Sequence, residues 1–169
     1  TDVSGLRVFV AAREQDHERA QLVRDALYRI AAAASTAADL PDFYGQIHAV
    51  IGDLMDARNF YIALYDAGRG AINFPYYVDS VDPDIPDPSA WESFGVGDAG
   101  GLTAYVLRTG RAALVPQDRW KALVAAGEIA SVGVDGEDWL GAPLLWQGAA
   151  IGVVVVQTYE AGRHYSDRD

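Results

Sequence analysis

The sequence contains no cysteine. This absence excludes a disulfide framework, a thiolate metal site and any cofactor attached through a thioether bond. Basic residues are also few: 13 lysines and arginines stand against 24 aspartates and glutamates, which gives a net charge of −11. Nucleic acid and anionic membrane surfaces repel a chain of this charge, so neither is an expected partner.

Long hydrophobic runs are missing as well. No apolar stretch approaches the roughly 20 residues needed to span a bilayer, and no signal peptide opens the chain. The 169 residues, half of them hydrophobic, are enough for one domain with its own core. The chain starts at Thr1 and stops at Asp169, where a new helix is expected to begin. We therefore expect a piece of a longer cytoplasmic protein.

The most informative stretch is residues 139–159, W-L-G-A-P-L-L-W-Q-G-A-A-I-G-V-V-V-V-Q-T-Y. Gln147-Gly148 separates two apolar runs and is a pair of the kind that closes an antiparallel hairpin. The second run, residues 149–156, is apolar throughout, and its four consecutive valines favour a strand over a helix. A strand with one face in water would alternate apolar and polar residues. This hairpin is therefore expected at the centre of a sheet covered on both faces.

Two amphipathic helices are expected before the sheet. Residues 6–10 read either as a short strand or as the lead-in to the first helix, residues 16–34. The apolar stripe of this helix consists of Ala20, Val23, Leu27, Ile30 and Ala34, and it suits packing against a twin. Asp39 is the expected N-cap of the second helix, with Pro41 in its first turn. These helices are the candidates to cover one face of the sheet.

The middle of the chain is expected to form a hairpin of residues 59–66 and 71–79. Pro75 cannot donate a ladder hydrogen bond, which predicts an edge position for the second strand. Residues 80–98, rich in proline and acid, are expected to form a long loop. The elements expected after it are a helix at 102–109 ended by Gly110, a strand at 112–115 and a helix at 118–128.

Two patterns suggest a binding site, and each has a simpler explanation. Gly95-x-Gly97-x-x-Gly100 matches the dinucleotide fingerprint, but that motif requires a preceding strand within a parallel β-α-β unit. We expect these glycines to turn the backbone into the next helix, with anion binding by the exposed amides as the alternative. The acidic loop around Asp82, Asp84 and Asp87 lacks the glycine and the terminal glutamate of a calcium loop. A solvated loop is expected there.

No catalytic or metal site is expected. His17, His48 and His164 are scattered and have no partner at metal-ligand spacing, so neither a metal ion nor a haem is predicted. No nucleophile stands beside a plausible base, and no paired carboxylates lie at element ends. The sequence therefore predicts a protein that is not an enzyme.

Four strings resemble a GAF domain, a sensory module of bacterial signalling proteins. They are A-R-N-F-Y-I-A-L-Y-D (57–66), G-G-L-T-A-Y-V-L-R-T-G (100–110), W-L-G-A-P-L-L (139–145) and G-A-A-I-G-V-V-V-V-Q (148–157). They occur in the order and spacing of that family, and the resemblance covers residues 20–169. It implies an α+β, PAS-related fold: a six-stranded antiparallel sheet with helices on one face and a loop with short helices over a pocket on the other.

The resemblance also implies a role. Such a domain belongs to a sensor histidine kinase of a two-component system or to a cyclic-di-GMP enzyme. Its flanking helices form a homodimer and pass a signal to an output domain. Residues 1–15 are then a linker or the end of an upstream domain, and residues 16–169 are a GAF domain without its C-terminal helix. The methionine sulfoxide reductase branch and thiol-linked bilins both need cysteine, so neither is expected. The asparagine-lysine-phenylalanine signature of cyclic-nucleotide-binding relatives is also missing, which disfavours that ligand.

The predicted pocket is mainly aromatic. Its expected lining consists of Phe60, Ile62, Phe74, Tyr76, Tyr105, Trp120, Trp139 and Gln157. Alternation places Phe60 and Ile62 on one face of their strand and Tyr61 and Ala63 on the other, and the sequence leaves open which face holds the pocket. Plain core packing is the alternative to a pocket for a planar ligand. Gln157 and Asn73 are either satisfied sheet positions or groups directed into the pocket.

Two functions follow from this reading. The first is a domain that senses an unidentified small molecule and passes its binding state through flanking helices to an output domain. The alternative is a ligand-free dimerisation module whose pocket is filled by its own aromatic side chains.

Overall fold

The computed structural model describes residues 3–94, 100–131 and 136–169. The chain divides into two compact units, Thr1–Leu54 and Met55–Asp169. No helix in the described ranges combines the length and the apolar character that crossing a bilayer requires.

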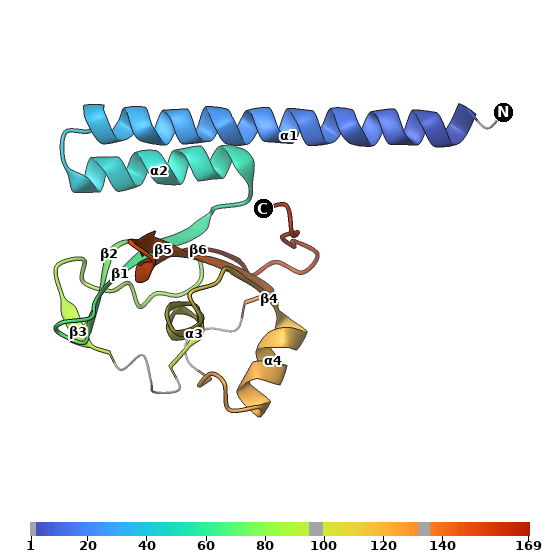
Figure 1. Ribbon diagram of the computed structural model, residues 1–169. Helices are drawn as coiled ribbons and strands as arrows, with labels where there is room; N and C mark the ends of the chain where they lie inside the picture. Colours follow the sequence, from blue (N-terminus) through green and yellow to red (C-terminus); the bar gives the residue numbers. More distant parts are fainter. Residues whose placement is uncertain (1–2, 95–99, 132–135) are drawn as a thin grey trace. The chain divides into compact units, whose positions relative to one another are not determined.

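The first unit is an antiparallel pair of helices, α1 (Val3–Thr36) and α2 (Leu40–Leu54) (Figure 1). Because α1 already begins at Val3, the strand alternative for residues 6–10 is wrong. The predicted N-cap of α2 is confirmed: the Asp42 N–H donates to Asp39 Oδ1 at 2.8 Å. The Asp42 carboxylate in turn accepts the Ala38 N–H at 2.9 Å, so two N–H groups at the helix start are satisfied.

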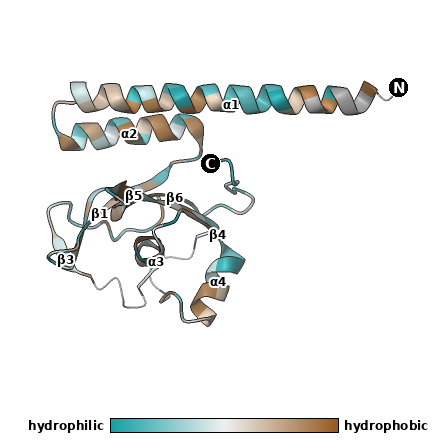
Figure 2. Cartoon of the chain, in the orientation of Figure 1, coloured by the Kyte–Doolittle hydropathy of each residue, from teal (hydrophilic) through white to brown (hydrophobic). Residues whose placement is uncertain are grey.

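The buried face of α1 differs from the predicted stripe. Ala26 and Ala33 are buried, whereas Leu27 is 61% exposed. Small side chains at these positions let two helices approach closely, and an Arg29–Asp53 ion pair of 2.7 Å joins α1 to α2. Hydrophilic residues run along much of α1, whereas α2 is more apolar (Figure 2). The predicted stripe is therefore largely left uncovered within this pair.

The second unit contains a six-stranded, open antiparallel sheet in the order β3-β2-β1-β6-β5-β4 (Figure 1). The strands are β1 (Asn59–Asp66), β2 (Ala71–Val78), β3 (Trp91–Ser93), β4 (Ala113–Pro116), β5 (Asp138–Trp146) and β6 (Ala149–Thr158). The β5–β6 hairpin closes at Gln147-Gly148, where φ is 50° and 79°, as a turn with two left-handed residues requires. β6 lies between β1 and β5, which confirms the predicted central position.

Burial along β6 changes from one end to the other. Val153, Val155 and Val156 are buried, so both faces are covered over this half of the strand. Near the turn, Trp146 is 65% exposed and Ile151 is also exposed. The expectation of two covered faces therefore holds for the distal half of the hairpin and fails at its tip.

Two expectations about β2 and the loop after it need correction. β3 was expected to be loop, but it pairs with Ala71–Asn73 and takes the edge position that was assigned to β2. The Asn73 amide stabilises this arrangement by donating to the carbonyl oxygens of Pro88 and Ala90 at 2.9 and 2.7 Å. Pro75 lies past this pairing, where the β1–β2 register shifts and β2 carries one extra residue. A proline is tolerated there because a bulge interrupts the ladder.

Helices α3 (Leu102–Thr109) and α4 (Gln117–Ala125) lie on one side of the sheet (Figure 1). α3 ends at Gly110, whose φ of 65° is left-handed as expected for this position. It packs against β5 and β6 through Val106 and Leu107, which join Val153 and Val155 of the sheet in one buried core. This side of the sheet holds the cavity described next.

Candidate functional site

A cavity of about 270 Å³ lies between the sheet and the starts of α3 and α4. The sheet contributes mainly aromatic side chains, and the helices contribute residues from their first turns. Its lining consists of Tyr61, Phe74, Tyr77, Val115, Asp138, Trp139 and Gln157 from the sheet, Leu102, Thr103, Ala104, Gln117 and Trp120 from the helices, and Asp82, Phe94, Gly101, Gly136 and Tyr159 around them. The volume suits a small metabolite rather than a dinucleotide.

The floor of the cavity is built from paired aromatic rings. Tyr61 of β1 and Tyr77 of β2 are direct cross-strand partners. Their rings stack with centroids 4.8 Å apart and an angle of 10° between planes. Phe74 meets both rings edge-on, at 5.8 and 6.0 Å. Such stacked and edge-on pairs stabilise the sheet and fix the ring faces that a ligand would meet.

The Tyr61 hydroxyl links the floor of the cavity to its cover. It accepts the indole N–H of Trp139 at 3.3 Å and lies 2.8 Å from the Thr103 hydroxyl on α3. Because an indole nitrogen can only donate, Tyr61 can donate its own proton to Thr103. Burial raises the pKa of Tyr61, so this hydroxyl stays neutral at physiological pH.

A carboxylate outside the lining, Asp79, holds the polar end of the cavity in place. Its Oδ2 accepts the side-chain amide of Gln157 at 2.9 Å and the hydroxyl of Tyr159 at 2.6 Å. Its Oδ1 accepts the N–H groups of Val81 and Asp82, each at 2.8 Å. Burial raises the pKa of Tyr159, and the hydrogen bond to Asp79 raises it further. All four donors are neutral.

The glycine at position 141 leaves the space that the Trp139 ring occupies. The indole ring packs over Gly141, where an added methyl group would overlap the ring. These two residues share a face of β5, so the absence of a side chain at Gly141 is what lets the ring lie flat along the strand. The W-L-G string is thus a local signal for this arrangement.

Four of the eight expected pocket residues line the cavity: Phe74, Trp120, Trp139 and Gln157. Phe60 and Ile62 lie on the opposite face of β1 from Tyr61, because successive side chains of a strand alternate. Tyr76 belongs to that opposite face too, and its ring meets Phe60 at 5.7 Å. Tyr105 belongs to α3 and packs against the core, with the Arg108 guanidinium over its ring at 5.7 Å. That any lining residue binds a ligand stays a prediction.

Sequence reasoning missed Tyr61, Tyr77, Tyr159, Thr103 and Asp82 as lining residues. The first two follow once the other face of β1 is chosen, since Tyr77 lies directly across from Tyr61. Asp82 and Tyr159 lie beyond strand ends, where periodicity carries no information. Gly95 and Gly97 of the glycine motif lie outside the described residues, and Gly101 serves as an N-cap of α3 without a side-chain hydrogen bond.

The described part of the chain contains no group of three or more histidine, aspartate or glutamate side chains placed to hold a metal ion. A cavity lined by phenols, indoles, amides, hydroxyls and the carboxylates of Asp82 and Asp138 is suited to binding and orienting a small molecule. Its chemistry is that of recognition, with hydrogen-bonding groups set among aromatic faces.

An open antiparallel sheet with a cavity beneath short helices defines the class: a PAS-like α+β fold. Within this class the chain belongs to the GAF family, because the family model for the GAF domain matches residues 17–169. This confirms the family resemblance and the GAF-like fold. A search of curated proteins finds no match to the chain.

Solved structures agree on the fold. The GAF domain of an Acinetobacter phosphoenolpyruvate-protein phosphotransferase is 18% identical, with a TM-score of 0.60 over 85% of this chain and 80% of that one. The corresponding domain from Coxiella burnetii is 15% identical, with a TM-score of 0.63 over 89% and 82%. A free methionine-R-sulfoxide reductase from Neisseria meningitidis, solved with its substrate, is 15% identical, with a TM-score of 0.61 over 90% and 81%. At these identities the likeness concerns the fold alone.

Proposed function

We propose that this chain is a small-molecule-sensing regulatory domain of a cytoplasmic bacterial signalling protein. The observation that carries the proposal is the cavity of about 270 Å³, whose walls combine aromatic faces with hydrogen-bonding groups held in place by Asp79. GAF domains are regulatory and sensory modules, and a lined cavity of this kind is the feature that a sensor needs.

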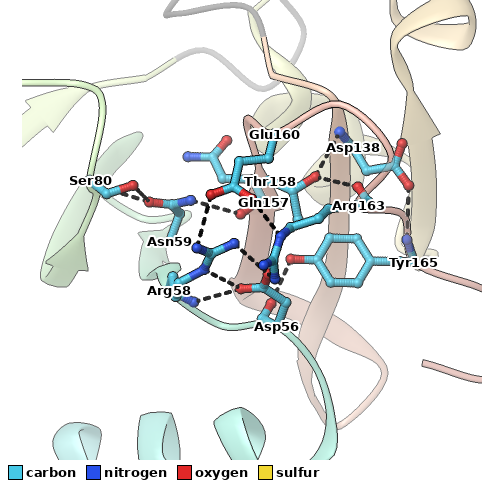
Figure 3. A network of polar contacts seen from close by, with 10 residues as sticks. All are labelled: Asp56, Arg58, Asn59, Ser80, Asp138, Gln157, Thr158, Glu160, Arg163 and Tyr165. Carbon is cyan, nitrogen blue, oxygen red and sulfur yellow. Dashed lines mark hydrogen bonds and ion pairs between the residues drawn. The ribbon is translucent and has the colours of Figure 1, made fainter.

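The route by which binding would be passed on begins at Tyr159. This residue lines the cavity and directly follows β6, so a ligand that moves it also moves the segment that follows. That segment is tied to the start of β1 by the polar network of Figure 3. Arg58 pairs with Glu160 at 3.1 Å, Arg163 pairs with Asp56 at 3.0 Å, and the Tyr165 hydroxyl donates to the Asp56 carbonyl at 2.6 Å. A ligand would act by preferring one arrangement of this segment.

The alternative function, a dimerisation module, is favoured by a different observation. Val23 and Leu27, four residues apart and therefore on one face of α1, are exposed large hydrophobic residues. A twin helix would cover them, as expected for flanking helices that form a homodimer. The two functions are compatible, and an unfilled cavity volume favours sensing over a pocket closed by its own side chains.

We propose no reaction for the chain itself. The Neisseria meningitidis neighbour is an enzyme, but the chemistry of that branch requires cysteines and this sequence has none. Catalysis, in this proposal, belongs to an output domain such as a histidine kinase or a cyclic-di-GMP enzyme.

The test uses the indole N–H resonances of the four tryptophans in a ¹⁵N-labelled sample. Trp120 and Trp139 line the cavity, whereas Trp91 and Trp146 are exposed. Fractions of a bacterial small-molecule extract are added, and active fractions are identified by native mass spectrometry. We expect at least one fraction to shift the first two resonances and leave the other two in place.

A matched pair of variants locates the binding. Leu102→Phe adds bulk to the cavity and should weaken the response, whereas Leu145→Phe on the exposed hairpin tip should not. Shifts confined to Trp91 and Trp146, or no shift with any fraction, would contradict the proposal.

A further inference from the structure

The cavity lies in the most acidic part of the chain. The sequence has no lysine, arginine or histidine between Gly70 and Leu107, nor between Ala122 and Gly162. These two stretches supply most of the lining, and no basic side chain lines the cavity in the described ranges. Residues 95–99 and 132–135 carry no basic residue either. Anionic ligands therefore have no countercharge from a side chain here.

The three carboxylates near the cavity differ in what they can still accept. Asp138 accepts the Tyr165 N–H at 2.9 Å and pairs with His164 Nδ1 at 3.0 Å. Asp79 accepts four hydrogen bonds, as described above. Asp82 accepts a single one, from the Asp84 N–H at 2.9 Å, and no basic group within the described residues forms an ion pair with it. Because a carboxylate has about four acceptor positions, Asp82 retains most of its capacity.

The Asp82 carboxylate also lies on the aromatic side of the cavity. Its negative charge contributes to raising the pKa values of both Tyr77 and Tyr159, after burial and nearer groups. It is half-buried, so its charge is less screened than that of the exposed Asp84 on the same loop. Asp82 and the stacked pair of Tyr61 and Tyr77 line the same cavity, so its contents meet both a carboxylate and aromatic rings.

One feature of the cavity favours the opposite charge. The first turn of α3 lines it, and a helix start carries roughly half a positive charge. This partial positive charge would favour an anionic ligand. The carboxylates of Asp82 and Asp79 and the aromatic ring faces favour a cation instead. The carboxylate and the rings outweigh the helix start.

We propose that the cavity binds a compact organic cation, a protonated or quaternary amine, held between Asp82 and the rings of Tyr61 and Tyr77. The inference rests on the proposed sensing function and adds the chemical class of the ligand. A volume of about 270 Å³ limits that ligand to a small amine.

Three probes of nearly the same shape test the charge. They are choline, its neutral counterpart 3,3-dimethylbutan-1-ol, and the anion 3,3-dimethylbutanoate. Binding to the whole chain is followed through the indole resonances of Trp120 and Trp139 at low salt. We expect choline to bind at least about tenfold more tightly than the other two. Equal or tighter binding of the alcohol or the anion would overturn the inference while leaving a small-molecule site, and hence the proposed function, in place.

A null result with all three probes would also overturn the inference, and the extract experiment then decides the proposed function separately. The variant Asp82→Asn keeps an acceptor for the Asp84 N–H and removes only the charge. It should weaken choline binding about threefold to tenfold and leave binding of the alcohol unchanged. Asp84→Asn, on the same exposed loop and outside the lining, is the matched control and should change choline binding less than twofold. Equal effects of the two variants would place the cation elsewhere.

Discussion

At the scale of single residues, Tyr61 connects the sheet to the cover of the cavity. Its ring stacks on Tyr77, and its hydroxyl contacts both Thr103 and Trp139. Tyr61 is only 7% exposed, so these contacts are shielded from water. The integrity of the cavity therefore depends on one phenol hydroxyl.

The first prediction concerns that hydroxyl. Tyr61→Phe should lower the free energy of unfolding by about 1–3 kcal/mol, because two polar groups lose their partner in a buried site. The measurement is urea unfolding followed by tryptophan fluorescence. Tyr105→Phe is the control, since no hydrogen bond of its hydroxyl is found in the described residues. A loss no larger than that of the control would show that the Tyr61 hydroxyl is dispensable.

The second prediction concerns His164. Its hydrogen bond to Asp138 and the charge of that carboxylate raise its pKa above 6.5. The folded state then holds the proton more tightly than the unfolded state. The stabilisation is fully present below about pH 6.5 and is lost as the pH rises through the folded-state pKa.

His164→Gln should therefore destabilise the protein more at pH 5.5 than at pH 8.5, as measured by urea unfolding at both values. The effect is small because the imidazole is exposed to solvent. His17→Gln, at an exposed position of α1, is the control for the loss of a histidine side chain. A pH-independent effect of His164→Gln would rule out the ion pair with Asp138.

At the scale of elements, the pairing of β6 with β1 leaves no space at Gly152. A methyl group there would overlap the carbonyl oxygen of Ala63, a backbone atom that cannot move aside. The third prediction is that Gly152→Ala lowers the free energy of unfolding by at least about 1 kcal/mol. The methyl group added by Gly45→Ala in α2 meets nothing within 4 Å, so this variant should leave the free energy of unfolding unchanged or raise it. Thermal unfolding of the two variants compares them, and equal melting temperatures would contradict the tight pairing.

At the scale of the whole molecule, the exposed apolar residues of α1 predict self-association. Leu27→Glu should weaken a homodimer about tenfold or more, because it places a charge where the twin helix would cover an exposed leucine. Sedimentation equilibrium over a range of concentrations measures this, with circular dichroism to confirm unchanged helix content. Gln21→Glu adds the same charge at another exposed position of α1 and serves as control. A wild-type chain that is monomeric at all concentrations would contradict the prediction.

The charge of the whole molecule complements the inference about the ligand. A net charge of −11 creates a field that attracts cations and repels anions over distances up to a Debye length. The rate of choline binding should therefore fall as salt is added, whereas binding of the neutral alcohol should not.

Local patterns by themselves determined the elements and, with the family strings, the fold class. The Gln147-Gly148 turn, the run of valines, the Asp39 cap and the Gly110 end each follow from short-range chemistry and are found where predicted. β3 could not be predicted in this way, because three residues form a strand only when β2 offers them a ladder.

Only the tertiary structure decided which face of β1 holds the cavity. Both faces of that strand are apolar, so alternation distinguishes Phe60 from Tyr61 without saying which of them points toward α3. The same holds for α1, where packing against α2 selects Ala26 and Ala33 over the larger Leu27. Asp82 and Tyr159 meet at the cavity from segments that are far apart in the sequence. Periodicity records how residues repeat along one element, whereas a site depends on which elements face one another, and that is a property of the folded chain.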